Sequence, residues 1–182
     1  MDFIDPRDGK VYKIVEIGSQ IWMAQNLAYN VIGSKCYENK RTNGKTYGRL
    51  YDWETAMSVC PPGWHLPSKK EWNILVNFAG GAKIAGKKIK AKTGWNDYRG
   101  ISGNGTDDFG FNALPGGYCN SNFHDDEFYK MGEDENWWSS SRTMVCLGIN
   151  YKHECTGWFP ASDGSCFLSV RCIKNSKEVK DA

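Results

Sequence analysis

The chain has 182 residues, and its 23 basic and 21 acidic side chains leave a formal net charge of +2. So balanced a charge gives no reason to expect nucleic acid or an anionic membrane as a partner, and no apolar run approaches the roughly 18 residues of a membrane-spanning helix. Because no Pro- or Ser-rich linker and no internal repeat occurs, we expect a single domain over residues 1–175 and a charged tail over residues 176–182.

The first predicted element is a β-hairpin. Polar and apolar residues alternate from Val11 to Ile17 and from Gln20 to Asn26, and Gly18-Ser19 between them suits a two-residue type II′ turn. Residues 28–50 contain several glycines and show little periodicity, which predicts a surface loop.

Two predicted helices flank a corner at residues 60–68, Cys-Pro-Pro-Gly-Trp-His-Leu-Pro-Ser. Apolar residues at spacings of three and four predict the first helix from about Asp52 to Val59. Ser68 and Glu71 form an S-x-x-E capping box that opens the second helix, and Gly80-Gly81 ends it. The three prolines leave the corner few conformations.

Further strands are predicted towards the C-terminus. The lysine-rich segment at residues 83–92 is interpreted as a solvated face rather than a ligand patch. Strand candidates then cover Asn136–Ser140, Met144–Tyr151 and Phe167–Lys174. The predicted order is a hairpin, two helices, long loops and then antiparallel strands. This order is typical of an α+β fold and not of βαβ units.

The cysteine content indicates an oxidising compartment. Seven cysteines occur with eight tryptophans and 20 glycines. The start, Met-Asp-Phe-Ile-Asp-Pro, lacks a basic, apolar leader, so we expect that an exported form has lost its signal segment. No C-x-x-C and no H-x-x-x-H occurs, so zinc is not expected, and the odd number of cysteines leaves one thiol unpaired.

Evidence for catalysis is weak in the sequence. The serines at 139–141 lack the G-x-S-x-G context of a nucleophile elbow, and no histidine is placed to suggest a triad partner. His65, between Trp64 and Leu66, is interpreted as a packed histidine with a backbone partner. We therefore do not expect an enzyme.

Six short motifs carry a family resemblance. In chain order they are Y-G-R-L-Y-D-W at 47–53, C-P-x-G-W-H-L-P at 60–67, E-W at 71–72, G-F-x-x-L-P-G-G at 110–117, W-S-S at 138–140 and S-V-R-C at 169–172. Together they resemble the Fibrobacter succinogenes major paralogous (FISUMP) domain over nearly the whole chain. The resemblance implies a C-type-lectin-like fold, with two helices, small antiparallel sheets and long loops. Members of the family are mostly exported bacterial proteins, often surface lipoproteins.

The resemblance also implies one disulfide. In lectin-like folds a cysteine of the first helix is bonded to one in the final strand, and Cys60 and Cys172 occupy these places. Relatives often have a cysteine near Gly44 that faces the one at Cys36, so Cys36 is the candidate for the unpaired thiol.

The remaining four cysteines allow further pairing. Cys155 and Cys166 flank residues 157–164 and could staple a hairpin, which would leave Cys119 with Cys146. Sequence alone does not fix the connectivity, so both pairings are hypotheses.

Calcium is the cofactor that we considered. Residues 95–97, Trp-Asn-Asp, resemble a signature of calcium-dependent sugar-binding lectins, but that signature belongs just before the final cysteines. The acidic clusters at 107–108, 125–127 and 133–135 are interpreted as turn and loop residues. No cofactor is therefore expected, and calcium remains the alternative.

The segment from residue 142 to residue 165 is the candidate for recognition. If Val145, Leu147 and Ile149 face the core, alternation places their neighbours on the opposite face. The candidate ligand-binding residues are Arg142, Met144, Asn150, Tyr151, Lys152, Glu154, Trp158 and Phe159. Aromatic side chains on a rigid frame suit recognition, whereas the alternative is that these aromatics only close a small core.

Three functions follow from these observations. The first is an exported or cell-surface module that binds a glycan or a protein through its C-terminal loops without chemistry. The second is a variable ligand-binding protein diversified by a retroelement, as in related lectin-fold proteins. The third is an oxidase similar to formylglycine-generating enzymes, with Cys166 and Cys172 as the reactive pair, although the surrounding residues do not match that active-site motif.

Overall fold

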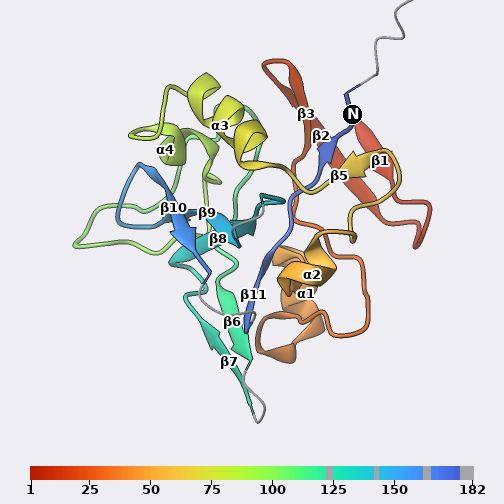
Figure 1. Cartoon of the computed structure of the whole chain (residues 1–182). Coiled ribbons are helices and arrows are strands. Elements are labelled where there is room, and N and C mark those ends of the chain that lie inside the picture. Colours follow the sequence, from red (N-terminus) through yellow and green to blue (C-terminus); the bar gives the residue numbers. More distant parts are fainter. Residues whose placement is uncertain (122–124, 142–143, 162–164, 177–182) are drawn as a thin grey trace, which may run out of the picture.

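The computed structural model describes residues 1–121, 125–141, 144–161 and 165–176 (Figure 1). It has an α+β architecture with mostly antiparallel sheet, which confirms the predicted fold class. The helices are α1 (Arg41–Tyr47), α2 (Trp53–Ala56), α3 (Lys69–Phe78) and α4 (Ala85–Ile89), with a 3-10 turn, η1, at Tyr37–Asn39. The strands are β1 (Asp2–Ile4), β2 (Val11–Ile17), β3 (Gln20–Met23), β4 (Leu50–Tyr51), β5 (Trp64–His65), β6 (Tyr118–Ser121), β7 (Asp126–Tyr129), β8 (Asp134–Trp138), β9 (Val145–Asn150), β10 (Thr156–Pro160), β11 (Cys166–Ser169) and β12 (Ile173–Lys174).

The first sheet, in the order β1-β2-β3-β12-β5, brings the two ends of the chain together. It contains the predicted hairpin, in which Gly18 has the positive φ of 60° that the first position of a type II′ turn needs. Strand β3 ends at Met23, earlier than predicted, because the chain then turns Asn26 into the interior. β12 pairs through Ile173 with both β3 and β5.

The second sheet has the order β10-β9-β8-β11-β6-β7, with β4 also paired to β11. Figure 1 shows it on the left and at the bottom, with the first sheet at the upper right. The prediction of one strand over residues 167–174 is wrong, because Val170–Cys172 leave the ladder and separate β11 in the second sheet from β12 in the first. Strands β6, β7 and β10 were not predicted; they are short and form by pairing with other strands.

The helix after the corner begins at the predicted capping box. Ser68 Oγ accepts a hydrogen bond from Glu71 N at 3.2 Å, and Glu71 Oε2 accepts one from Ser68 N at 2.8 Å. The helix before the corner is shorter than predicted and ends at Ala56. Two predicted irregular segments also contain helices, α1 in the predicted loop and α4 in the lysine-rich segment. None of the helices in the described residues is long and apolar enough to cross a membrane.

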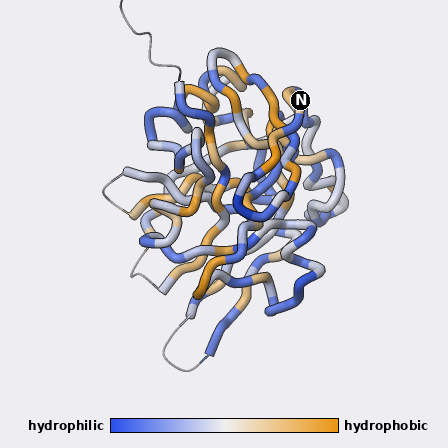
Figure 2. Tube along the Cα trace, turned by 90° about the vertical axis from the view of Figure 1, so that its right-hand side faces the viewer, coloured by the Kyte–Doolittle hydropathy of each residue, from blue (hydrophilic) through white to orange (hydrophobic). Residues whose placement is uncertain are grey.

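Aromatic side chains fill the centre of the molecule. Trp72 of α3 lies between Trp22 and Trp137, with ring centroids 4.7 and 5.5 Å away, and Phe111 packs edge-on against all three rings. Figure 2 shows hydrophobic segments running through the interior and hydrophilic ones towards the periphery. Because this cluster joins both sheets to α3, it fixes the inner face of the second sheet.

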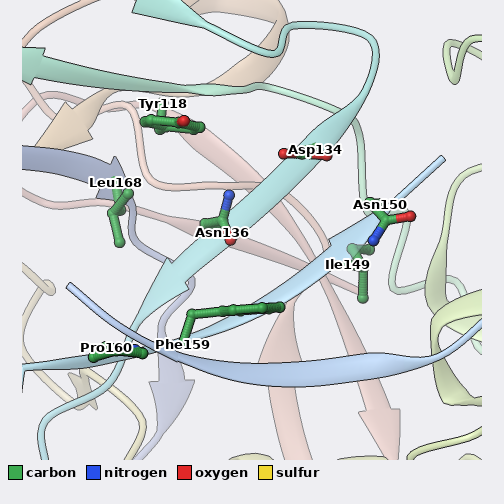
Figure 3. Close-up of a pocket in the computed structure, with 8 residues that line it drawn as sticks. All are labelled: Tyr118, Asp134, Asn136, Ile149, Asn150, Phe159, Pro160 and Leu168. Atoms are coloured by element: carbon green, nitrogen blue, oxygen red, sulfur yellow. The ribbon is translucent and has the colours of Figure 1, made fainter. Parts of the chain in front are cut away.

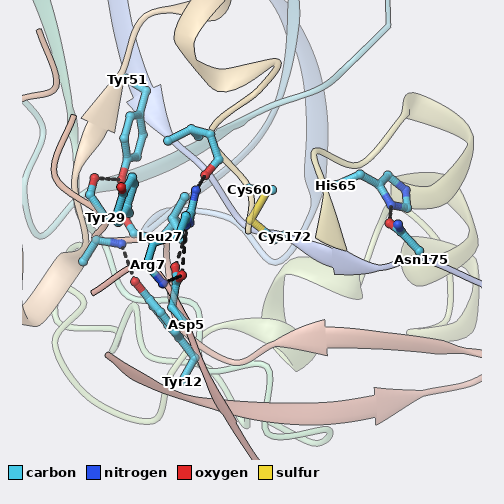
Figure 4. Close-up of a disulfide and its surroundings, with 12 residues drawn as sticks. Asp5, Arg7, Tyr12, Leu27, Tyr29, Tyr51, Cys60, His65, Cys172 and Asn175 are labelled. Atoms are coloured by element: carbon cyan, nitrogen blue, oxygen red, sulfur yellow. Dashed lines mark hydrogen bonds and ion pairs between the residues drawn. A yellow bond between two sulfur atoms is a disulfide. The ribbon is translucent and has the colours of Figure 1, made fainter. Parts of the chain in front are cut away.

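A disulfide joins the corner to the C-terminal segment. Cys60 is bonded to Cys172, with 6.0 Å between their Cα atoms, as the family resemblance implied (Figure 4). Beside it, Arg7 forms an ion pair of 2.7 Å with Asp5 and donates a hydrogen bond to the carbonyl of Val59. The N-terminal segment, the corner and the segment just before the last strand are therefore held together at one place.

A buried polar network orients β8. Glu135 is fully buried, and its Oε1 and Oε2 accept hydrogen bonds from Asn26 Nδ2 at 2.9 Å and Gly116 N at 2.7 Å. Asn26 Oδ1 in turn accepts from Arg171 Nε at 2.9 Å. Burial raises the pKa of Glu135 and lowers the pKa of Arg171. Since Glu135 is anchored inside, its strand neighbours Asp134 and Asn136 point to the opposite face.

Candidate ligand-binding site

The β8, β9 and β10 strands have one face against the aromatic core, and we call the opposite face the outer face. At one end of the outer face Trp138 and Cys146 are buried in a second hydrophobic cluster, whereas around Asp134, Asn136 and Phe159 it reaches the surface. Leu147 and Ile149 belong to the core cluster, as predicted for one side of the alternation. The ladder places Asn136, Gly148 and Gly157 opposite one another on the outer face. Alternation from Leu147 and Ile149 thus places Gly148 on the outer face, as expected, whereas Cys146 on the same face is buried in a second core cluster.

A pocket of about 370 Å³ opens on the outer face (Figure 3). Its lining residues come from five strands and are Tyr118, Asp134, Asn136, Ile149, Asn150, Phe159, Pro160 and Leu168. Figure 3 shows Asp134 and Asn136 between Tyr118 on one side and Phe159 on the other. We call this the outer-face pocket.

Two glycines allow Phe159 to lie across the sheet. A Cβ atom at Gly148 would be 2.8 Å from Phe159 Cε2, and one at Gly157 would be 3.0 Å from the same atom. The ring thus occupies the space that side chains would fill on β9 and β10, and 49% of Phe159 remains exposed. The result is an aromatic surface with a fixed position and an accessible side.

Two polar side chains of β8 stand beside this ring without hydrogen-bond partners among the described residues. They are the Asp134 carboxyl and the Asn136 amide. Partial burial raises the pKa of Asp134, and the charges of Lys130 and Lys152 oppose that shift. The Asp134 carboxylate can accept hydrogen bonds from a polar ligand, and the Asn136 amide can both donate and accept them.

The predicted ligand-binding residues do not form one group. Asn150 and Phe159 line the outer-face pocket, although Asn150 Oδ1 also accepts hydrogen bonds from the backbone of Lys152 and His153. Met144 lies partly exposed just before β9, and Arg142 is outside the described residues.

The other four predicted residues lie away from this pocket. Tyr151, Lys152 and Glu154 line a second pocket at the turn between β9 and β10. Trp158 faces the core side, where its Nε1 donates to Asn73 Oδ1 at 3.2 Å, so for this residue the core-closing alternative describes the packing better. Trp158 and Phe159 point to opposite faces because neighbouring residues of a strand alternate.

Sequence analysis missed most of the outer-face pocket. Tyr118, Asp134, Asn136, Pro160 and Leu168 were not among the predicted residues. Only pairing between distant strands brings them together, as with β6 and β11. The one available signal was alternation in β8, which places Asp134 and Asn136 on the face opposite the core residue Trp137.

The two further disulfide predictions are wrong. The structure joins neither Cys155 to Cys166 nor Cys119 to Cys146. Cys155 lies just before β10 and Cys166 in β11, with β9 and β8 between these strands; Cys119 lies in β6 and Cys146 in β9, with β11 and β8 between them. Three strand spacings amount to about 14 Å, whereas disulfides need Cα atoms within about 7 Å. Burial raises the pKa of the Cys119 and Cys146 thiols to about 11 in each case.

Cys36 is not in a disulfide, as predicted, and its thiol is buried, but it is one of five cysteines outside the disulfide rather than the single unpaired one. Because Cys172 is bonded to Cys60, it does not form a reactive pair with Cys166. The oxidase alternative needed a Cys166–Cys172 pair, so the observed disulfide does not support it.

The other candidate sites have structural partners. The indole of Trp95 donates to the carbonyl of Ala113, and Asp107 accepts from the backbone of Asn112. His65 lies between two side-chain oxygens, with Nε2 2.7 Å from Glu71 and Nδ1 2.7 Å from Asn175, rather than against a backbone group (Figure 4). Within the described residues, no three His, Cys, Asp or Glu side chains gather in a way that could hold a metal ion.

The comparison with protein families gives one match. The model described as the Fibrobacter succinogenes major domain matches residues 15–174, which include every strand of the outer-face pocket. No curated protein and no solved structure matches the chain.

Proposed function

Because the chain belongs to the Fibrobacter succinogenes major domain family, we propose that it is a non-catalytic module that binds a glycan in the outer-face pocket. The observation that carries the proposal is the Phe159 ring, which lies over two glycines near Asp134 and Asn136, whose side chains have no hydrogen-bond partner among the described residues. The ring face suits the C–H side of a sugar ring, and the carboxylate and amide suit its hydroxyl groups.

The open shape of the pocket also favours one unit of a longer glycan over an enclosed small molecule. The pocket is open to solvent and combines apolar residues, Phe159, Pro160 and Leu168, with the polar residues of β8. Ligand sites in proteins combine an apolar lining with a few placed polar groups in this way. A glycan with adjoining units outside the pocket fits such an open surface.

Export to the cell surface is part of the proposal. A disulfide between Cys60 and Cys172 persists in an oxidising compartment, which supports an extracellular location. Two features support a C-type-lectin-like fold. One is the sheet that joins both ends of the chain, and the other is the disulfide from the corner to the segment just before the last strand.

Absence of chemistry is likewise proposed. The Ser139 hydroxyl donates to the Ser141 hydroxyl at 3.3 Å, and neither has a histidine partner within the described part of the chain. Such a pair lacks the base that would activate a serine nucleophile.

A glycan array followed by calorimetry tests the proposal. The oxidised protein is expected to bind a subset of glycans, and Phe159→Ala should weaken the binding about tenfold or more, because it removes the stacking surface. Phe78→Ala is the matched control, since Phe78 is similarly exposed but lies on α3. An array without bound glycans, or binding that Phe159→Ala leaves unchanged, would contradict the assignment.

A further inference from the structure

A second, basic pocket of about 150 Å³ lies at the turn between β9 and β10, against α4 and the loop at residues 98–102. It shares no lining residue with the outer-face pocket. The side chains that matter for its chemistry are those of Lys87, Lys90, Tyr98, Tyr151, Lys152 and Glu154. Three of these six are lysines and one is acidic.

Lys90 is a buried cation, contrary to the expectation that the lysine-rich segment is a solvated face. Only 2% of the residue is exposed, and its Nζ donates to the carbonyls of Asn150 at 3.2 Å and His153 at 3.1 Å. In the described part of the chain, no carboxylate lies within 4.0 Å of this ammonium group. A buried charge is costly without a counter-charge, and two carbonyl groups offset that cost only in part.

The neighbours of Lys90 increase the positive potential. Burial, followed by the charge of Lys87, lowers the pKa of Lys90 to about 8, while Glu154 and Cys155 act in the opposite direction. Glu154 Oε1 is 4.0 Å from Lys87 Nζ, and its side chain is mostly exposed, so this pair contributes little. Lys87 Nζ also donates to the carbonyl of Asn104 at 3.1 Å, so among the described residues only the distant, exposed Glu154 offers these two ammonium groups a negative charge.

Two tyrosines form an aromatic wall next to these charges. The rings of Tyr98 and Tyr151 meet edge-on, with centroids 5.7 Å apart. Lys152 Nζ lies 5.0 Å from the Tyr98 centroid and 5.3 Å from the Tyr151 centroid, so the ammonium group is held against both rings. A ligand that enters would meet a cation and an aromatic surface together.

We propose that this pocket binds the anionic group, a carboxylate or a sulfate, of an acidic glycan. The inference rests on the proposed glycan-binding function and adds the class of glycan. Lys90 and Lys87 supply the positive charges, Lys152 closes the site from the turn, and the tyrosine pair contacts the sugar that bears the anion. Asn150 connects the two pockets, because it lines the outer-face pocket while its carbonyl accepts from Lys90.

The test compares neutral, uronate and sulfated oligosaccharides of equal length by calorimetry at low and high salt. Acidic oligosaccharides should bind about tenfold or more tightly than the neutral ones at low salt, and the advantage should shrink in salt. Uronate and sulfate ligands compared side by side identify which anion is preferred. Equal affinity for neutral and acidic ligands would overturn the inference and leave the proposed function standing.

Variants locate the effect. Lys87→Gln and Lys152→Gln should each reduce affinity for the acidic ligand by roughly threefold to tenfold while leaving neutral ligands unaffected. Lys83→Gln is the matched control, because Lys83 is an exposed lysine of the same segment that does not line the pocket. Both lysines that are changed are partly or fully exposed, so these variants should fold even where Lys90→Gln does not.

The outcomes separate the two proposals. If Lys87→Gln loses binding of the acidic ligand while Phe159→Ala binds it normally, the result would support the basic pocket. The same result would contradict the outer-face pocket as a glycan site. If Phe159→Ala loses binding of the acidic ligand while Lys87→Gln and Lys152→Gln bind it normally, the result would contradict only the assignment of the basic pocket.

Discussion

Gly44 of α1 lies against the thiol of Cys36, and a cysteine at this position should form a new disulfide with it. A Cβ atom built at Gly44 lies 3.5 Å from the Cβ of Cys36 and 2.5 Å from its Sγ. Cβ–Cβ separations of about 3.5–4.5 Å are typical of disulfides. Gly44 is not among the glycines with positive φ, so a side chain there adds no backbone strain.

The expected stabilisation follows from the length of the closed loop. A bond between residues 36 and 44 closes about nine residues, which on the chain-entropy model stabilises the folded state by about 2.5 kcal/mol. In a chain of this size about 1 kcal/mol corresponds to about 2–4 °C in Tm, so Gly44→Cys should raise Tm by about 5–10 °C. Gly44→Ser is the control, because it introduces a side chain of similar size that cannot form the bond.

Thermal unfolding and thiol titration under non-reducing conditions check this prediction. The denatured wild-type protein carries five thiols, and the variant should carry four if the bond forms. Six thiols, together with a Tm no higher than that of Gly44→Ser, would refute the reasoning from the Cys36–Gly44 geometry.

Three other substitutions test the frame and the outer-face pocket. Gly148→Ala should displace Phe159 and Asn136, because the new Cβ would lie 2.8 Å from the ring and 2.5 Å from Asn136 Oδ1. Calorimetry should then show that glycan binding is lost, and the free energy of unfolding should fall by about 1–3 kcal/mol. Removing the disulfide by Cys60→Ala with Cys172→Ala should lower the free energy of unfolding by about 4–5 kcal/mol on the chain-entropy model, because the bond spans 112 residues, and urea titration measures it. Asp5→Asn should make stability depend less on pH in acid. In the folded protein burial raises the pKa of Asp5, but hydrogen bonds and charge from Arg7 lower it more. The unfolded chain therefore binds the proton more readily, and the wild-type protein loses stability as the pH falls. Urea midpoints that fall in parallel for both proteins from pH 7 to pH 3 would contradict it.

Local signals in the sequence predicted the elements that are formed locally. The capping box of Ser68 and Glu71 marks the start of α3, and Gly18 marks the hairpin turn, because each depends on a few neighbouring residues. Helix α1 has no such signal. Its sequence, Arg-Thr-Asn-Gly-Lys-Thr-Tyr, has no apolar stripe, and Gly44 is buried there because it packs against Cys36.

The sites required information that the sequence does not hold locally. Lys90 is buried because carbonyl groups 60 and 63 residues further along the chain accept its hydrogen bonds, so a local lysine-rich pattern predicted the wrong environment. For Trp158 and Phe159 the sequence leaves two alternatives, exposure for recognition or closure of a small core. Only the register with β9, which pairs Trp158 with Leu147, shows that Trp158 takes the core side.

The same register separates the residues that hold the fold from those proposed to bind the ligand. In β8, Glu135 and Trp137 face the core, while Asp134 and Asn136 face the outer-face pocket. Since alternate residues serve the two roles, Asp134 and Asn136 can change without altering the aromatic cluster or the buried network. Substitutions of Asp134 and Asn136 should therefore alter ligand binding more than stability, so a change in glycan affinity in these variants reports on contacts with the ligand.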